Sequence, residues 1–231
     1  MTGGPPRDGV EWHEGIAAGF SARYDKSAAF RERLSIWSRL IDAHVPPGGE
    51  ALDAGCGPGH LSRLCARRDA RVTALDAAGA MLEIARAAAA AEHLDIAFVS
   101  ARIGDPTALA DRRFDVILCS SVLEYVEDLD AALAWLAQRL GPGGTLVVSM
   151  PNGPSLYRRL ERLAFRLSGR PRYCAFQRHA PAPDDFAHRL ERHGLRPDPP
   201  IFHGGPSALR PLLPGPALRE PLMVFAARAM S

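Results

Sequence analysis

The stretch 51–59, which reads ALDAGCGPG, constrains the fold of this chain more than any other feature. Asp53 stands two positions ahead of the first of three glycines, Gly55, Gly57 and Gly59, where an apolar run ends. Glycines let the backbone turn sharply and approach a ligand with no Cβ in between. The pattern therefore predicts a nucleoside-binding turn between a buried strand and a helix. The alternative is a tight turn that binds nothing.

The spacing of the glycines separates two kinds of cofactor. A dinucleotide fingerprint is G-x-G-x-x-G, whose third glycine packs the helix and whose helix N-terminus faces the pyrophosphate. Here the spacing is G-x-G-x-G, and His60 occupies the place of that third glycine. Asp53 would repel a pyrophosphate but could help to hold a ligand that carries an ammonium or sulfonium charge. The spacing therefore disfavours a dinucleotide.

Asp53-x-Gly55-x-Gly57-x-Gly59, followed by Asp76 after a short apolar run, resembles the first two motifs of class I S-adenosylmethionine-dependent methyltransferases. The resemblance extends over about residues 51–152 and implies S-adenosylmethionine as the cofactor. Asp76 ends an apolar run about twenty residues beyond the turn, where a carboxylate can accept both ribose hydroxyl protons. Its alternative is to cap the next helix. We expect cofactor contacts from Tyr24, Asp53, Gly55, Cys56, Gly57, Asp76, Met81, Arg102, Ile103 and Ser120.

Composition limits the class of protein. The chain has 231 residues, of which 47% are apolar, enough for one domain with one core. A formal charge of +2 gives no argument for nucleic acid as a partner. The four cysteines show no metal-ligand or C-x-x-C spacing and are interpreted as free thiols in a reducing compartment. No apolar run is long enough for a membrane span or a signal core, so we expect a cytoplasmic protein.

The fold implied by the resemblance is an α/β, doubly wound, Rossmann-like sheet of seven mostly parallel strands, in the order 3-2-1-4-5-7-6. The last strand is expected to be antiparallel, and Gly141–Gly144 to form a turn. We expect an N-terminal helical lid (1–45), a cofactor-binding core (46–152) and a segment of the same domain (153–231) with an acceptor-side insert helix, a last helix and the final strands. The predicted strands are 51–54, 71–75, 96–100, 114–119, 145–150, 201–203 and 222–227.

The segment after the third predicted strand departs from the family. Relatives usually place an acidic residue there, which accepts a hydrogen bond from the adenine amino group. The best register puts Arg102 at that position. The amino contact is then lost or moved to Asp105, while the backbone of Ile103 can still support the ring. Arg102 could also stack on the ring or be solvated.

The segment Ser120–Val126 follows the fourth predicted strand and resembles the cofactor-flanking loop of the family. It lacks the Pro-Pro-aromatic and Pro-Cys motifs of enzymes that methylate nucleobases. It also resembles ubiquinone-pathway O-methyltransferases, whose acidic and histidine residues at this point can hold a metal. Ser121 and Tyr125 stand where an acid and a histidine are expected, which leaves Glu124 alone. One carboxylate is a poor divalent site, so we predict no metal.

The region beyond Asn152 has an individual pattern. Leucines recur at helical spacing from Leu156 to Leu167, and arginines occupy the other faces. One interpretation is a solvated basic face. The other is an insert that covers the active site and attracts an anionic acceptor, such as a carboxylate, a phosphate or a carrier-tethered intermediate.

Methyl transfer from a sulfonium requires a positioned acceptor and the exclusion of water, without a covalent nucleophile. A hydroxyl acceptor must lose its proton, and a neutral histidine is a suitable base for a phenol. His179 is the first candidate, and Tyr125, Glu124 and His13 are weaker ones. We therefore expect methyl transfer to a small-molecule hydroxyl. The alternatives are nitrogen or carbon acceptors, a cofactor-binding protein without transfer activity, and a dinucleotide-dependent oxidoreductase.

Overall fold

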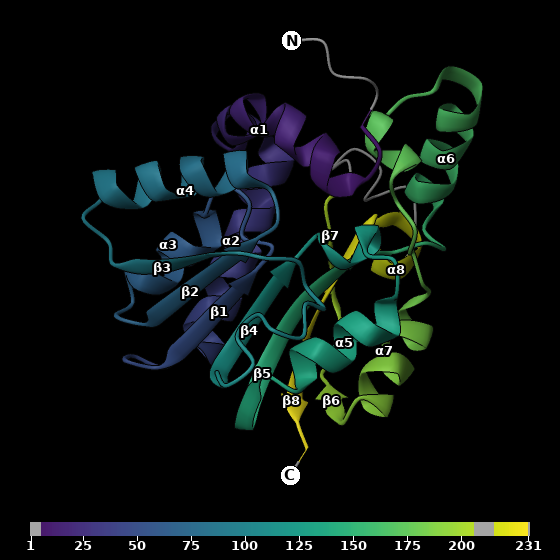
Figure 1. Cartoon of the computed structure of the whole chain (residues 1–231). Helices are drawn as coiled ribbons and strands as arrows, with labels where there is room; N and C mark the ends of the chain where they lie inside the picture. Colours follow the sequence, from purple (N-terminus) through teal and green to yellow (C-terminus); the bar gives the residue numbers. More distant parts are fainter. Residues whose placement is uncertain (1–5, 206–214, 231) are drawn as a thin grey trace.

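A computed structural model of the chain describes residues 6–205 and 215–230, apart from the side chains of residues 18 and 20–26. Within these residues it has an eight-stranded sheet in the order β3-β2-β1-β4-β5-β8-β6, and β7 pairs with β8 (Figure 1). The first five strands run parallel, and β8 is antiparallel to β5. The strands are β1 (Glu50–Ala54), β2 (Arg71–Asp76), β3 (Ile96–Ser100), β4 (Phe114–Ser120), β5 (Leu140–Pro151), β6 (Leu195–Pro197), β7 (Ile201–His203) and β8 (Leu222–Ala229).

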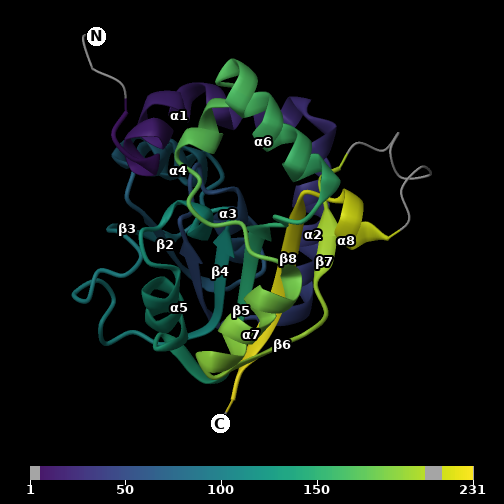
Figure 2. The ribbon, with the colours of Figure 1, turned by 90° about the vertical axis from the view of Figure 1, so that its right-hand side faces the viewer.

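Two helices precede the sheet, and the other helical segments of the described residues lie between its strands. Figures 1 and 2 place α1 above the sheet, at the same end of the molecule as α6. The helical segments are α1 (Gly9–Lys26), α2 (Ala28–His44), α3 (His60–Ala66), α4 (Gly79–Ala91), η1 (Leu123–Tyr125), α5 (Leu129–Ala137), α6 (Leu156–Ser168), η2 (Arg172–Ala175), α7 (Pro183–Arg192) and α8 (Pro216–Arg219).

Successive side chains of a strand point to opposite faces of the sheet, and helices cover both faces, so both sets of side chains are buried. Leu52 of β1 packs with residues of α5 and α7 on one face. Its neighbour Ala51 packs with residues of α2, α3 and α4 on the other. Trp37 of α2 and Phe186 of α7 are fully buried in these two layers. This double burial leaves the strand ends as the place where a ligand can enter.

The predicted fold class and strand order are confirmed, with one correction at the sheet edge. The sixth predicted strand is the second half of an interrupted edge strand, of which sequence reasoning missed the first half. Both halves pair with β8, β6 through Leu195 opposite Ala229 and β7 through Ile201 opposite Val224. The residues between them include Pro199-Pro200, which have no backbone N–H to donate to a ladder.

A second correction concerns residues 141–144, which were expected to form a turn. They lie instead inside β5, which begins at Leu140. Leu140 pairs with Phe114 and Thr145 with Val116, so four residues of β5 lie opposite one residue of β4. The glycines allow the backbone to accommodate this irregularity without leaving the sheet.

Gly55 provides a test of the packing around the glycine turn. Its φ is +77°, and a Cβ would lie 2.3 Å from Cγ2 of Val122. We expect Gly55→Ala to lower the free energy of unfolding by about 2–4 kcal/mol, through overpacking added to backbone strain. Gly48→Ala is the matched control, because Gly48 also has a positive φ but open space around it. It should cost only about 1 kcal/mol. Equal losses in urea unfolding would contradict this explanation.

Candidate cofactor and acceptor site

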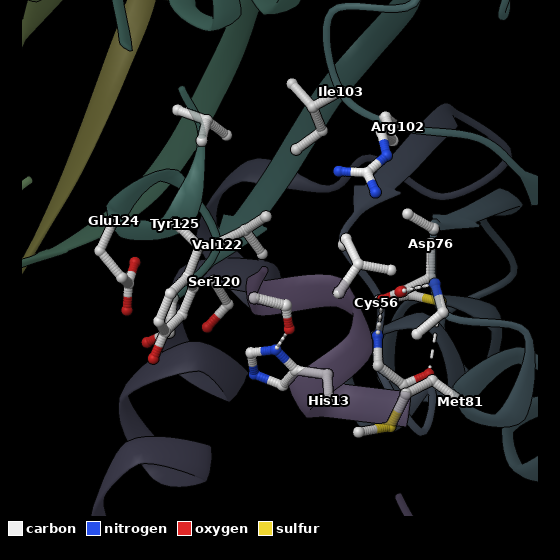
Figure 3. Close-up of a pocket in the computed structure, with 18 of the residues that line it drawn as sticks. His13, Cys56, Asp76, Met81, Arg102, Ile103, Ser120, Val122, Glu124 and Tyr125 are labelled. Atoms are coloured by element: carbon white, nitrogen blue, oxygen red, sulfur yellow. Dashed lines mark hydrogen bonds between the residues drawn. The ribbon is translucent and has the colours of Figure 1, made fainter. Parts of the chain in front are cut away.

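A cavity of about 810 Å³ lies at the carboxyl ends of β1, β2 and β4. Those strand ends contribute Asp53, Asp76 and Ser120, and α1 closes the cavity with Trp12 and His13. Figure 3 shows Asp76 and Met81 on one side of this pocket and Glu124 and Tyr125 on the other. The cavity therefore has a cofactor side, where the predicted motif residues gather, and a second side that is open to another ligand.

The three glycines after β1 have distinct functions in the turn. All have positive φ values, of 77° at Gly55, 53° at Gly57 and 75° at Gly59. A Cβ at Gly57 would meet open space within the described residues, which is the environment expected where a ligand approaches the backbone. A Cβ at Gly59 would lie 2.9 Å from Cβ of Ala85 in α4. Gly59 thus allows close helix packing, which the spacing had not indicated.

Asp76 connects the glycine turn to the end of β2. Its carboxylate accepts hydrogen bonds from the backbone N–H of Gly57 (2.8 Å) and of Ala78 (2.8 Å). Burial raises the pKa of Asp76. Each carboxylate oxygen has a second lone pair, so the group can also accept from a ribose. Ribose binding and support of the next helix, the two alternatives for Asp76, are therefore compatible. Asp76 supports the start of α4 while it lines the cavity.

Asp53 lies beneath the turn and is 1% exposed. Ser62 donates to its Oδ2 at 2.6 Å, and its Oδ1 has no hydrogen-bond partner within the described residues. Burial raises the pKa of Asp53 to about 6. A buried oxygen with no partner is costly, and a cationic group on a bound ligand would offset that cost. Cys56 and Met81 are buried beside the cavity and line it.

The expected adenine side is bounded by Arg102, Ile103 and Asp105, all of which line the cavity. Arg102 is largely exposed and forms an ion pair with Asp8 at 2.9 Å, which joins the start of α1 to this loop. The carboxylate of Asp105 accepts from the backbone N–H and the hydroxyl of Thr107, at 2.8 and 2.7 Å. Arg102 and Asp105, two of the candidates for the adenine contact, thus already bind other protein groups, while Ile103 is half-buried.

The second side of the cavity contains Glu124, in η1. Its side chain is almost completely buried, and Oε2 has no hydrogen-bond partner within the described residues. Burial raises the pKa of Glu124 to about 7, although the positive charges of Arg158 and Arg33 act in the opposite direction. A carboxyl group in this state can hold or release a proton near neutral pH.

Tyr125 and His13 pack against each other in the lining of the cavity. Their rings meet edge to face with centroids 5.1 Å apart. Nδ1 of His13 donates to the carbonyl oxygen of Gly9 at 2.6 Å, so Nε2 is the unprotonated nitrogen of the neutral ring. Burial lowers the pKa of His13 and raises that of Tyr125. Both residues therefore favour their neutral forms.

The placement of His179 corrects the first choice of base. Its Nε2 donates to the carbonyl oxygen of Val126 at 2.9 Å, and the residue is not among those that line the cavity. His179 instead supports η1 from behind, because its backbone N–H also bonds to the carbonyl oxygen of Glu124. The side chain of Tyr24 lies outside the described part of the structure.

Two arginines that sequence reasoning did not assign to the site also line the cavity. Arg33 of α2 donates to the hydroxyl oxygen of Ser120. Arg158 of α6 is buried, and it bonds to the carbonyl oxygen of Pro221 and to the hydroxyl of Tyr173. The one available signal was Glu161, an acid three residues after Arg158 in an otherwise basic helix, and the two form an ion pair.

Other site types find no match in the part of the chain that the structure describes. Residues 6–205 and 215–230 contain no group of three or more histidine, cysteine, aspartate or glutamate side chains arranged to hold a metal ion. None of the helices in these residues is both long and apolar enough to span a membrane.

Comparison with known proteins shows that residues 52–148 match the methyltransferase domain family. The chain is similar to malonyl-[acyl-carrier protein] O-methyltransferase of Serratia marcescens, with 37% identity over 140 residues, 59% of this chain and 52% of that protein. It is also similar to a ubiquinone biosynthesis O-methyltransferase of Xanthomonas campestris pv. campestris, with 37% identity over 106 residues, 46% of this chain and 44% of that protein. The chain thus spans about half the length of these curated relatives.

Two solved structures share the fold over most of their length. N-methyltransferase NodS of Bradyrhizobium japonicum WM9, in complex with S-adenosyl-L-homocysteine, has a TM-score of 0.65 at 20% identity, covering 90% of this chain and 91% of NodS. Magnesium protoporphyrin IX methyltransferase ChlM of Synechocystis PCC 6803 has a TM-score of 0.64 at 17% identity, covering 98% and 90%. Residues 52–148, which contain the glycine turn, Asp76 and η1, therefore have the sequence of a methyltransferase domain.

Proposed function

We propose that this chain transfers a methyl group from S-adenosylmethionine to a hydroxyl oxygen of a small-molecule acceptor. The observation that carries the proposal is one cavity in which the glycine turn and Asp76 lie together with the buried carboxyl group of Glu124. The two relatives described above are O-methyltransferases by name, which supports oxygen as the acceptor atom.

The residues on the cofactor side fit the proposed cofactor. The open space at Gly57 admits a ligand against the backbone, and Asp76 has lone pairs left for ribose hydroxyls. Oδ1 of Asp53, which has no partner among the described residues, suits a ligand with a positive charge. When bound, S-adenosylmethionine supplies a methyl group activated by its sulfonium charge. Methyl transfer then depends on how the protein positions the acceptor and excludes water.

On the acceptor side, Glu124 is our choice of general base. Its carboxylate accepts the hydroxyl proton as the acceptor oxygen attacks, and burial keeps its pKa near the working pH. Arg33 and Arg158 supply positive charge on the same side and favour an acceptor with an anionic group. Trp12 and Phe30 provide apolar walls. The substrate in the name of the Serratia relative is joined to an acyl-carrier protein, so carrier-tethered acceptors belong to the same proposal.

The alternatives have less support. The names of the two O-methyltransferase relatives favour oxygen over nitrogen or carbon acceptors. A dinucleotide-dependent oxidoreductase does not agree with the family match. A cofactor-binding protein without transfer activity was favoured only by Arg102. The ion pair with Asp8 compensates that charge, which weakens the argument.

Asp76→Ala tests the cofactor side. The substitution removes the carboxylate that we propose accepts the ribose hydroxyl protons, so affinity for S-adenosylmethionine and S-adenosylhomocysteine should fall at least about a hundredfold in isothermal titration. Asp76→Asn, which keeps one acceptor oxygen, should lose less. Asp111→Ala, at an exposed aspartate, is the control and should bind normally. Unchanged affinity in a folded Asp76→Ala protein would refute the ribose assignment.

Glu124→Gln tests the buried carboxyl group through stability. Between its usual pKa of 4.5 and its folded-state value of about 7, the folded protein binds more protons than the unfolded one. The free energy of unfolding therefore falls as the pH rises through this range. In urea unfolding we expect the variant to exceed wild type by on the order of 2–3 kcal/mol at pH 8, and by under about 1 kcal/mol at pH 5.

The control for this measurement is Glu127→Gln, whose parent side chain is exposed. It should leave the pH dependence unchanged. A Glu124→Gln protein that is less stable than wild type at pH 8 would show that the carboxylate has a compensating partner.

The same substitution tests catalysis. With 3,4-dihydroxybenzoate as a probe that carries both a phenol and a carboxylate, and methyl-labelled cofactor, the wild-type rate should rise through about pH 7 and then level off. Glu124→Gln should lower kcat by about 10²–10³ and lack this rise, because general-base catalysis contributes an effect of that size. Tyr125→Phe should keep the rise. If the wild-type chain binds the cofactor but methylates no member of a panel of phenols and hydroxy acids, the choice of a hydroxyl acceptor is overturned.

A further inference from the structure

Helix α6 presents its apolar side to solvent. Leu160, Leu163 and Leu167 are 55%, 52% and 80% exposed. Successive helical residues are about 100° apart, so the three leucines share one face, roughly opposite the buried Arg158. A surface helix of a globular protein normally packs its apolar face on the core. In α6 the apolar face points to solvent and the polar side chain of Arg158 is buried.

Polar contacts hold α6 in this orientation. Nε of Arg158 donates to the carbonyl oxygen of Pro221 at 3.0 Å, and Nη1 donates to Glu161 and Tyr173. The hydroxyl of Ser155 accepts from the backbone N–H of Arg158 and caps the helix. The leucine row therefore makes little contribution to the core, and its apolar surface is open to another layer.

The surroundings of the leucine row are strongly basic. Residues 156–172 contain six arginines and one glutamate, a net charge of +5, whereas the whole chain carries +2. Glu161, the one acid, is largely buried and paired with Arg158. Within this described segment the arginines that are exposed are Arg159, Arg162, Arg166, Arg170 and Arg172.

We propose that the α6 outer face, which consists of Leu160, Leu163 and Leu167 with Arg159 and Arg166, docks on the surface of an anionic phospholipid bilayer. A helix with an apolar row beside a row of arginines lies in the plane of the membrane interface, its apolar side chains among the acyl chains and its cations near the headgroups. The proposal does not depend on the proposed acceptor or reaction.

The shape and charge of this face favour a bilayer over a protein partner. The leucines project from the convex side of a single helix, so they match a flat, deformable apolar layer better than a protein groove. The cations flank them and continue beyond the helix end at Gly169, which suits an extended anionic surface.

Docking through this face would bring the cavity close to the lipid. Arg158 and Tyr173, on the inner side of the same segment, line the cavity. Figures 1 and 2 place α6 at the same end of the molecule as α1, which closes that cavity. The part of the cavity wall formed by Arg158 and Tyr173 would then lie one helix diameter, about 10 Å, from the headgroups.

The test is co-sedimentation of the full chain with phosphatidylcholine vesicles that contain or lack phosphatidylglycerol. We expect binding that requires the anionic lipid and weakens at high salt. Leu163→Glu/Leu167→Glu should lower partitioning at least about tenfold, because two exposed apolar anchors become acidic. Leu218→Glu is the matched control, since Leu218 is also exposed, at 47%, but lies in α8. It should bind as wild type does.

Several results would overturn the proposal. These are no binding by wild type at low salt, equal binding to vesicles without anionic lipid, and equal losses in the α6 and α8 variants. If wild type does not bind vesicles but forms dimers in analytical ultracentrifugation, and the α6 variant is monomeric, the face binds a second copy of the chain instead. Titration with S-adenosylmethionine is run on every variant. A wild-type protein that binds vesicles but not S-adenosylmethionine would refute the proposed function and leave this inference standing.

Discussion

The hydrogen bonds that Asp76 accepts from the backbone of Gly57 and Ala78 connect three parts of the molecule on which the site depends. They join the glycine turn after β1, the end of β2 and the beginning of α4. The turn is also held by two backbone bonds to the carbonyl oxygen of Leu75. Because the glycines have backbone angles that other residues rarely adopt, this turn leaves an open backbone surface at Gly57. The cavity follows from that geometry.

Each side of the cavity contains a buried carboxyl group whose desolvation is not fully offset by hydrogen bonds from the described residues. Asp53 on the cofactor side and Glu124 on the acceptor side are both buried, and each has an oxygen without a partner in the described residues. Burial raises the pKa of both groups, to about 6 and about 7. A fold selected only for stability would replace them with neutral side chains. Their presence indicates that the polar groups are arranged for a ligand.

Where the sequence analysis failed, long-range contacts had decided the outcome. The sequence did not show which side of α6 is buried; Arg158 is buried there because its partners are Pro221 and Tyr173. Sequence reasoning also missed β6, which is defined by its pairing with β8, Leu195 lying opposite Ala229. His179 was the preferred base from its place in the chain, but its hydrogen bond to Val126 directs it away from the cavity. None of these contacts is local.

The sequence by itself determined the sheet, the glycine turn and the position of Asp76 beside it. Residues 51–59 and Asp76 lie at the ends of consecutive strands, and their spacing, the apolar runs before them and their backbone requirements are local properties. The acceptor side was decided only by the tertiary structure. Arg33, Glu124 and Arg158 come from segments far apart in the chain, and they meet because α2, η1 and α6 converge above the carboxyl ends of the strands. Periodicity describes one helix or strand at a time, whereas this convergence depends on the packing of several elements together.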